Sequence, residues 1–412
     1  MPYTQRGRSG GRPRLNGRPV PGGSRGRNQR PTSFKQGRGP KKANIAASRF
    51  VNKAEIVEQS EYTPKNSFAD FGFSTALMHN LERKGYKEPS AIQDQAMKPI
   101  LNGHDIIGLA NTGTGKTAAF LLPLIERQAE WTQRPSVLII APTRELAQQI
   151  KQELRDFSEG MNLYSALLVG GMNIDKQIRE LKRWPHFIVG TPGRINDLLE
   201  RRELQLKNIA CLVLDEADRM LDMGFLPMIR RIVAQVPRER QTLFFSATMT
   251  EDIRRLTGEY LRDPVLVSVR TSETSDHVEQ DVIRFEDKDH KLELLTHMLS
   301  QEEYEKVLVF GETKYGVQRL SEKLNRMGVS SEAIHGNKSQ AQRQRALSAF
   351  KNMQVKVLVA TDVAARGLDI PNVSHVINFD TPQTYEDYIH RIGRTGRAGA
   401  RGRAHTFLPK NG

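Results

Sequence analysis

Residues 110–117 read Ala-Asn-Thr-Gly-Thr-Gly-Lys-Thr, and the rest of the chain is organised around this stretch. An apolar run at 105–109 precedes it, and the apolar segment 118–125 that follows can open a helix. A strand, a glycine-containing turn, a Lys-Thr pair and a helix are the arrangement that holds a nucleoside triphosphate. We favour this interpretation over a glycine-rich turn with a chance lysine, because both flanking elements are in place.

The chemistry of this predicted phosphate loop follows from its residue types. Glycines let backbone N–H groups turn inward around a phosphate, and the helix start adds a partial positive charge. The ammonium of Lys116 can reach the β- and γ-oxygens, and the hydroxyl of Thr117 can ligate Mg²⁺. The residues expected to contact the nucleotide here are Thr112, Gly113, Thr114, Gly115, Lys116 and Thr117.

Size and composition indicate a globular protein of two or three domains. The chain has 412 residues, of which 38% are hydrophobic and 26% charged. No apolar run approaches the roughly 18–20 residues needed to span a bilayer, and the start lacks the apolar region of a secretion signal. The only cysteine, Cys211, lies in an apolar run, which predicts a buried core residue. No zinc-ligand spacing is present, and we expect a cytoplasmic protein that binds no membrane.

The net charge of +15 is concentrated near the amino end. Residues 1–42 carry nine Arg, three Lys and no acidic residue, which gives +12 and leaves 50 basic against 47 acidic residues elsewhere. Residues 1–45 are also rich in Gly and Pro, so we predict a disordered arm that cannot bury enough apolar surface to fold. Such an arm can bind nucleic acid by replacing counterions on phosphates; a solubilising tail or an anchor for acidic partners is the alternative.

Residues 46–269 are predicted to form one α/β domain. Short apolar runs alternate with helix-length amphipathic stretches, and the runs are 106–109, 137–140, 187–189, 212–214 and 242–245. Buried parallel strands that alternate with helices give a doubly wound sheet whose ligands lie beyond the carboxyl ends of the strands. Polar groups follow all five runs, so we expect the site at that edge.

A polar stretch at 270–279 is predicted to be a linker to a second domain of the same class, 280–412. The strand-like runs of this domain are 307–310, 331–334, 357–360, 375–378 and 405–408. The turn after 307–310 reads Gly-Glu-Thr-Lys, which is not a phosphate loop. The second domain instead offers arginines, so one nucleotide site is expected in the chain.

An acidic tetrad, Asp215-Glu216-Ala217-Asp218, follows the run 212–214 and should emerge beside the phosphate loop. Asp215 can hold Mg²⁺ directly or through water, and Glu216 can orient and deprotonate an attacking water. A solvated loop or a helix cap would be the ordinary interpretation of such a tetrad. The phosphate loop nearby favours catalysis.

Positive charge for phosphoryl transfer is predicted to come from the second domain, in the run 390–397, which reads His-Arg-Ile-Gly-Arg-Thr-Gly-Arg. Guanidinium groups stay charged and can bind phosphate oxygens through two N–H groups. The cluster could equally contact a nucleic-acid backbone, but its Gly-x-x-Gly spacing favours the nucleotide. Hydrolysis should then depend on domain closure, which a second ligand can bias.

Together these residues strongly resemble the DEAD-box family of ATP-dependent RNA helicases, with the characteristic motifs in order from Phe68 to Phe407. The resemblance implies two tandem RecA-like domains. It also implies that Phe68 stacks on adenine and that Gln93 reads the base edge, which favours ATP over GTP. The remaining roles implied for the nucleotide are arginine fingers at Arg394 and Arg397, a ribose contact at Asp369, and coupling contacts at Asp218, Ser246, Thr248 and His390.

The same resemblance implies an RNA path along both domains. Contacts of this kind go to the backbone and position a strand without reading its sequence. The expected contact residues are Arg144, Gly170, Gly171, Thr191, Arg194, Gln340, Arg343 and Thr361. Departures from the family pattern are small: Asn111 and Thr114 vary the phosphate loop, and Ser90-Ala91 varies the adenine-reading motif. None removes a group that the chemistry needs.

The leading hypothesis is therefore an ATP-dependent RNA helicase that separates short duplexes as its domains close on one strand, or remodels RNA–protein complexes. A second hypothesis is an ATP-gated RNA clamp or annealing chaperone in which the basic arm does the work. A third is a DNA translocase, disfavoured because the family distinguishes RNA by its 2′-hydroxyls. We expect a monomer, and no C-terminal accessory domain, since only fifteen residues follow Arg397.

Overall fold

The computed structural model describes residues 50–51, 62–111, 113–130, 134–269, 278–365, 370, 373–396 and 402–410. All of these residues belong to one compact unit, 43–412. Within it we call residues 62–269 the N-terminal lobe and residues 278–410 the C-terminal lobe. The predicted basic arm and the linker positions up to 277 lie outside the described residues.

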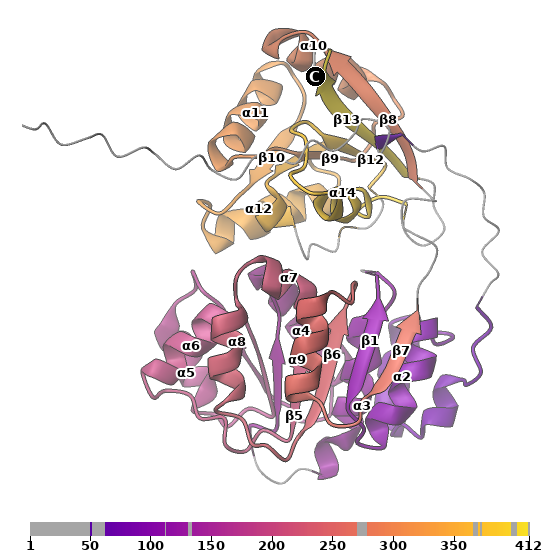
Figure 1. Cartoon of the computed structure of the whole chain (residues 1–412), viewed down its shortest axis with the longest axis vertical. Coiled ribbons are helices and arrows are strands. Elements are labelled where there is room, and N and C mark those ends of the chain that lie inside the picture. Colours follow the sequence, from indigo (N-terminus) through magenta and orange to yellow (C-terminus); the bar gives the residue numbers. More distant parts are fainter. Residues whose placement is uncertain are drawn as a thin grey trace, which may run out of the picture. The chain divides into compact units, whose positions relative to one another are not determined.

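The N-terminal lobe is built on a seven-stranded sheet in the order β3-β4-β2-β5-β6-β1-β7, and all its pairings are parallel (Figure 1). The strands are β1 (Ile106–Ala110), β2 (Val137–Ile140), β3 (Ser165–Leu168), β4 (Phe187–Gly190), β5 (Cys211–Leu214), β6 (Gln241–Ser246) and β7 (Val265–Val269). The inner strands are buried along their whole length because helices cover both faces.

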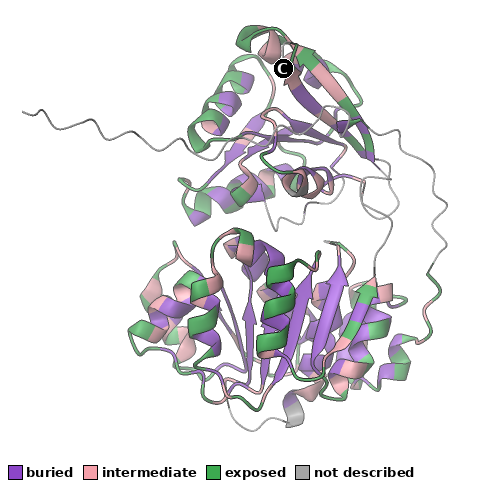
Figure 2. Cartoon of the chain, viewed as in Figure 1, coloured by how far each residue is buried: buried purple, intermediate pink, exposed green. Residues whose placement is uncertain are grey.

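Helices on the two faces of this sheet enclose two separate apolar clusters. Strand β2 shows how its residues alternate, because Val137 and Ile139 enter one cluster whereas Leu138 and Ile140 enter the other. The helices are η2 (Phe68–Phe71), α1 (Thr75–Arg83), α2 (Ala91–Leu101), α3 (Lys116–Glu126), η3 (Arg127–Glu130), α4 (Arg144–Phe157), α5 (Ile174–Leu181), α6 (Pro192–Glu200), α7 (Ala217–Asp222), α8 (Leu226–Val233) and α9 (Glu251–Tyr260). Figure 2 shows the buried strands between helices whose outer faces are exposed.

The C-terminal lobe repeats this plan with a six-stranded parallel sheet in the order β10-β11-β9-β12-β13-β8. Its strands are β8 (Val278–Phe285), β9 (Val307–Phe310), β10 (Ser331–Ile334), β11 (Val357–Ala360), β12 (His375–Asn378) and β13 (Gly402–Pro409). Its helices are α10 (Lys288–Ser300), α11 (Lys314–Arg326), α12 (Gln340–Lys351), α13 (Asp362–Ala365) and α14 (Tyr385–Ile392). Apolar clusters again lie on both faces.

The predicted fold class of two parallel α/β domains is confirmed, and each predicted apolar run forms a strand. Three strands were missed, and each lies at the edge of its sheet: β3, β7 and β8. Strand β8 buries less of its surface than a central strand and exposes alternate residues along its first half. Its sequence therefore lacks the continuous apolar run that identifies a central strand.

Cys211 is fully buried on β5, as predicted, and burial raises the pKa of its thiol. No helix among the described residues is long and apolar enough to cross a membrane.

Candidate active site and nucleic-acid interface

The phosphate loop joins β1 to α3 and depends on two glycines in the left-handed region. Gly113 has φ +90° and Gly115 has φ +93°, values that residues with a side chain rarely adopt. A Cβ atom on Gly115 would lie 2.4 Å from the Nε2 atom of Gln93. Helix α3 begins at Lys116, whose buried Nζ atom donates a hydrogen bond of 2.8 Å to the carbonyl oxygen of Ala110. The predicted order of strand, glycine-containing turn and helix is therefore present, and the binding of a phosphate by this turn stays a prediction.

Two side chains at the start of α2 donate hydrogen bonds to this loop. Ser90 Oγ donates to the carbonyl oxygen of Thr114 at 2.8 Å, and Gln93 Nε2 donates to that of Gly115 at 3.1 Å. Gln93 Oε1 also accepts from the backbone N–H of Ser90 at 3.0 Å, which closes a capping box. Gln93 thus couples α2 to the phosphate loop, a contact that the sequence analysis did not foresee. Its reading of an adenine edge stays a prediction.

Aromatic residues lie on the same side of the lobe. Phe68 is buried in η2, and its ring centroid is 6.1 Å from that of Tyr86 in an edge-on arrangement. Tyr86 in turn lines a cavity of about 190 Å³. The other lining residues include Gly113, Gly115, Lys116, Thr117, Asp215 and Glu216. One cavity therefore brings together the phosphate loop and the acidic tetrad, as predicted from the sheet edge.

The first two acidic residues of the tetrad are almost completely buried. Burial raises the pKa of Asp215 to about 7, even though the charge of Lys116 opposes the rise. Burial also disfavours the charged form of Glu216, but Arg219, Lys116 and Arg394 outweigh it and lower the pKa of Glu216. Glu216 has φ +50° and occupies the N-cap position of α7, so the strand-to-helix turn holds both carboxylates at the sheet edge. The Asp215 carboxylate is an oxygen ligand of the kind that Mg²⁺ takes, so this residue could hold a cation that is bound to a phosphate.

Asp218 connects this turn to the end of β6. Its Oδ2 atom accepts from the backbone N–H groups of Ala247 and Thr248 at 2.9 and 3.0 Å, and from the Thr248 hydroxyl at 3.2 Å. Burial opposes ionisation of Asp218, but the charges of Lys116, His390 and Arg219 lower its pKa. Ser246, which ends β6, is fully buried beside it. The predicted coupling residues of this lobe therefore form one cluster.

Arg219 was not recognised in the sequence. Among the residues that the structure describes it is the largest fully buried side chain, and its Nη1 atom lies 2.7 Å from Glu216 Oε2. Glu216 precedes Arg219 by three residues at the start of α7, and this short separation of opposite charges was the available signal. Arg219 fixes the carboxylate of Glu216 from the side of the helix.

The predicted RNA contacts of the N-terminal lobe also come together. The guanidinium of Arg144 lies over Gly170 and Gly171; a Cβ atom on Gly171 would be 2.3 Å from Arg144 Nη1. Arg194 reaches the same loop, where its Nη1 and Nη2 atoms lie 3.4 and 3.5 Å from the carbonyl oxygen of Met172. Thr191 immediately precedes α6. These residues share a groove of about 490 Å³, whose lining includes Arg144, Gly170, Thr191, Arg194 and Arg343.

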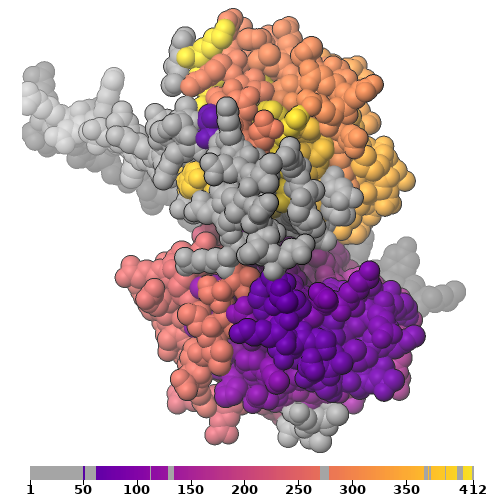
Figure 3. All heavy atoms as spheres, turned by 90° about the vertical axis from the view of Figure 1, so that its right-hand side faces the viewer, coloured from indigo at the N-terminus to yellow at the C-terminus, as the bar shows by residue number. Residues whose placement is uncertain are grey.

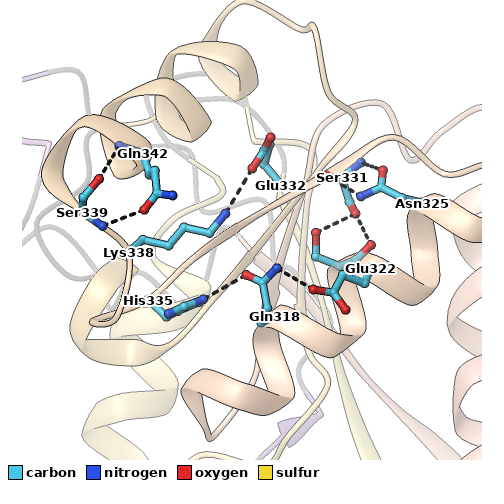
Figure 4. Close-up of polar contacts among 10 residues, drawn as sticks. Gln318, Glu322, Asn325, Ser331, Glu332, His335, Lys338, Ser339 and Gln342 are labelled. Carbon is cyan, nitrogen blue, oxygen red and sulfur yellow. Dashed lines mark hydrogen bonds and ion pairs between the residues drawn. The ribbon is translucent and has the colours of Figure 1, made fainter.

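Helix α12 carries the two RNA contacts predicted at Gln340 and Arg343. A capping box between Ser339 and Gln342 starts the helix (Figure 4). Arg343 pairs with Glu145 at 2.9 Å, and both groups are buried. Gln340 donates to Gln148 at 3.0 Å and to Glu145 at 3.3 Å. Glu145 is thus a second functional candidate that the sequence analysis missed, and no local spacing indicated its distant partner.

The arginine-rich turn of the C-terminal lobe follows α14. Arg394 is buried, and its backbone N–H donates to the carbonyl oxygen of Arg391. Arg391 itself binds Asp362 through two contacts of 2.6 and 2.8 Å. Thr361 accepts backbone hydrogen bonds at the start of α13. Three predicted site residues lie outside the described residues: Thr112, Asp369 and Arg397.

Comparisons with known proteins give the same picture for both lobes. Residues 90–256 match the family described as DEAD/DEAH box helicase, and residues 290–399 match the helicase conserved C-terminal domain. The DEAD-box ATP-dependent RNA helicase CshA of Bacillus cereus is 46% identical over 343 residues, which cover 83% of this chain and 65% of the relative. CshA of Geobacillus kaustophilus is also 46% identical, with 83% and 73% covered. The chain therefore spans about two thirds of the length of these relatives.

A solved structure has the same fold. It is Saccharomyces cerevisiae Dbp5 bound to RNA and ADP BeF₃, with a TM-score of 0.74 and 31% sequence identity. The match covers 84% of this chain and 90% of that one.

Proposed function

Because the chain belongs to the DEAD-box family of ATP-dependent RNA helicases, we propose that it hydrolyses ATP to ADP and phosphate in an RNA-dependent cycle that locally separates short RNA duplexes or remodels RNA–protein complexes. One observation carries the proposal. Lys116, Asp215 and Glu216 are all buried around a single phosphate loop, in a cavity whose charges suit a triphosphate.

The roles in hydrolysis follow from residue type and position. Lys116 holds the β- and γ-phosphate oxygens, and Glu216 orients a water and accepts its proton as the oxygen attacks the γ-phosphorus. The Asp215 carboxylate and the Thr117 hydroxyl fit Mg²⁺, which takes one or two carboxylate or hydroxyl ligands beside substrate phosphates. When bound, Mg²⁺ would neutralise charge on the phosphates. Phe68 and Gln93 recognise the adenine.

Arg394 and Arg397 act as arginine fingers in this proposal. The charge of Arg394 already lowers the pKa of Glu216, which supports a place near the phosphates. The C-terminal lobe therefore completes the site, with Asp369 at the ribose and His390 near Asp218. Hydrolysis then requires both lobes, and RNA bound across them favours the competent arrangement.

Single-stranded RNA is the proposed nucleic-acid ligand. Arg144 and Arg194 bind phosphates, together with the loop at Gly170 and Gly171, whose lack of side chains leaves room for the guanidinium of Arg144. Thr191, Gln340, Arg343 and Thr361 extend the path. These contacts do not read bases, so we expect little sequence preference and a clear fall in affinity as salt rises.

ATPase measurements with and without single-stranded RNA test this function. Glu216→Gln should keep ATP and RNA binding but lower kcat by about 100-fold or more, because the water loses its base. Arg394→Ala should lower ATPase without loss of RNA affinity. The matched control is Glu251→Gln, an exposed carboxylate on α9. An ATPase rate that RNA leaves unchanged, or that single-stranded DNA stimulates equally, would contradict the proposal.

A second candidate function is an ATP-gated RNA clamp or annealing chaperone, which the +12 charge of residues 1–42 favours. If deleting residues 1–42 abolishes annealing while unwinding persists, annealing belongs to the arm. If the deletion leaves the salt dependence of RNA affinity unchanged, the arm is not a phosphate binder. We also propose that the protein acts as a cytoplasmic monomer, which sedimentation of the full chain and fractionation of its cells will test.

A further inference from the structure

A residue that precedes the N-terminal lobe in the sequence is buried in the C-terminal lobe. Phe50 has no exposed surface and belongs to the apolar cluster of β9, β11, α12 and α14. Figure 1 shows the short indigo segment 50–51 among the strands of that lobe, and Figure 3 shows the same colour beside yellow and orange atoms. Its neighbour Val51 is 54% exposed, so the segment contributes one anchor and not a general apolar face.

The partner that the structure gives for this anchor is Tyr388 of α14. The two ring centroids are 4.8 Å apart and the planes meet at 73°, which is the favourable edge-on arrangement. Tyr388 is also completely buried, and its hydroxyl donates to Gln280 Oε1 at 2.7 Å. Tyr388 is therefore held between β8 on one side and Phe50 on another.

Helix α14 ends in the turn that carries the proposed arginine finger. Ile392 and Tyr388 face the same apolar cluster, four residues apart on the helix. Backbone hydrogen bonds then run from Arg394 to Arg391 at 3.1 Å and from Thr395 to Ile392 at 3.0 Å. His390 lies on the same helix, two residues after Tyr388. A shift of α14 against its core would consequently move His390 and Arg394 together.

We propose that Phe50 is a positioning residue for ATP hydrolysis, which holds α14 through Tyr388 and so sets the place of Arg394. This role rests on the proposed function of Arg394. Phe50 touches no substrate; it fills a position in the apolar core of the C-terminal lobe, against Tyr388. The segment in front of the N-terminal lobe thus takes part in the chemistry through the other lobe.

The rival explanation is that Phe50 only adds apolar burial to the C-terminal lobe. Both explanations predict a less stable lobe when the ring is removed. Only the positioning role predicts a specific loss of turnover in a protein that remains folded, with ATP affinity kept, because the phosphate loop and Gln93 lie in the N-terminal lobe.

The test uses the full chain with Phe50→Ala, Phe50→Leu and the adjacent control Val51→Ala. Hydrogen exchange without ligands reports on α14 and does not depend on any activity. In Phe50→Ala we expect amides of residues 385–392 to exchange about tenfold faster, because the helix loses its buried contact. RNA-stimulated kcat should fall about fivefold while the KM for ATP stays within about twofold, and Phe50→Leu should recover at least about half of kcat.

Each result decides the matter. Exchange in α14 that matches Val51→Ala would overturn the docking, and faster exchange with unchanged kcat would overturn the positioning role. If Phe50→Ala fails to fold by circular dichroism, Phe50→Leu must still show faster exchange and a lower kcat, or the proposal falls. If the unmodified chain has no ATPase activity, the proposed function is wrong, and the positioning role of Phe50 is wrong with it. The exchange data would still establish separately that Phe50 holds α14.

Discussion

The two lobes have the same sheet but different chemistry. The C-terminal sheet has the order β10-β11-β9-β12-β13-β8, in which β8 is the first strand of its lobe. When the strands of each lobe are counted from its first strand, this order is the same as β3-β4-β2-β5-β6-β1 in the N-terminal sheet. Strand β8 is therefore the counterpart of β1, the strand that leads into the phosphate loop. One topology thus supports a phosphate site in one lobe and none in the other, and the difference lies in the turn after the matching strand.

That turn contains Gly113, Gly115 and Lys116 after β1, but Glu286 and Asp287 after β8. Asp287 caps α10 by accepting from the backbone N–H groups of Asp289 and His290, both at 2.9 Å. A carboxylate thus takes the N–H groups at the helix start that would otherwise be open to a phosphate. Two acidic groups at this place repel a triphosphate.

The match between the lobes changes the basis of one prediction. The absence of a second phosphate loop was predicted from Gly311-Glu312-Thr313-Lys314, the turn after β9, because β8 lacks the apolar run that marks a strand. The true counterpart of β9 is β2. Both strands lead to a threonine cap, Thr143 before α4 and Thr313 before α11. The conclusion of a single phosphate loop stands, but on a different turn.

The largest effect should come from Gly115→Ala, which disturbs the phosphate loop, the turn that distinguishes the N-terminal lobe. The new Cβ would lie 2.4 Å from Gln93 Nε2, and φ +93° is strained for a residue with a side chain, so the Gln93 amide or the loop must shift. We expect ATPase to fall by about 100-fold, since displacement of about 1 Å in a phosphate site has that cost. Gly258→Ala on α9 is the control, because its Cβ meets nothing within 4 Å. Comparable ATPase rates in the two variants would refute the importance of the turn.

The second-largest effect should come from Arg391→Ala, which removes the hydrogen bonds and the ion pair that join α14 to α13 and β12. Arg391 is buried and binds Asp362, Asn378 and the carbonyl oxygen of Asp380. Asp362 is partly exposed, so we expect a loss of about 3 kcal/mol, at the lower end for a broken buried pair. Calorimetry should show that only the C-terminal lobe unfolds earlier. Arg326→Ala, at an exposed site, should change neither lobe.

The pH dependence of stability should give a smaller difference between the lobes. Burial, followed by the charge of His405, lowers the pKa of His375 from its ordinary value of 6.5 to about 4. The unfolded chain then binds the proton first, so the C-terminal lobe loses stability as pH falls from about 6.5 to about 4, by about 2 kcal/mol after allowance for screening. His375→Phe should reduce this slope, with a part remaining from His405, whose pKa burial also lowers, whereas exposed His297→Gln should leave it unchanged. An unchanged slope in His375→Phe would contradict the assignment.

The smallest effect tests the shared helix caps. Thr313 Oγ1 accepts from the backbone N–H of Gly316 at 3.0 Å at the start of α11. Thr313→Ala should cost about 1 kcal/mol in the free energy of unfolding, and Thr313→Ser should cost less because it keeps the acceptor. Denaturant titration of the three proteins measures this. Equal losses for Ala and Ser would show that the hydroxyl does not cap the helix.

The sequence by itself determined the central strands, the phosphate loop and the acidic tetrad. These features are local: buried parallel strands require continuous apolar runs, and a phosphate loop requires glycines and a Lys-Thr pair at fixed spacing. The meeting of Lys116 and Asp215 in one cavity was also predictable, because the carboxyl ends of parallel strands share an edge.

Only the tertiary structure decided which residues far apart in the chain touch. The burial of Phe50 against Tyr388, the pairing of Glu145 with Arg343, and the contact of Gln93 with Gly115 each join segments whose separation no periodicity encodes. The place of β8 beside β13 belongs here too, since an edge strand with one buried face lacks the apolar run of its neighbours. Local pattern specifies elements, whereas packing and long-range hydrogen bonds specify their partners.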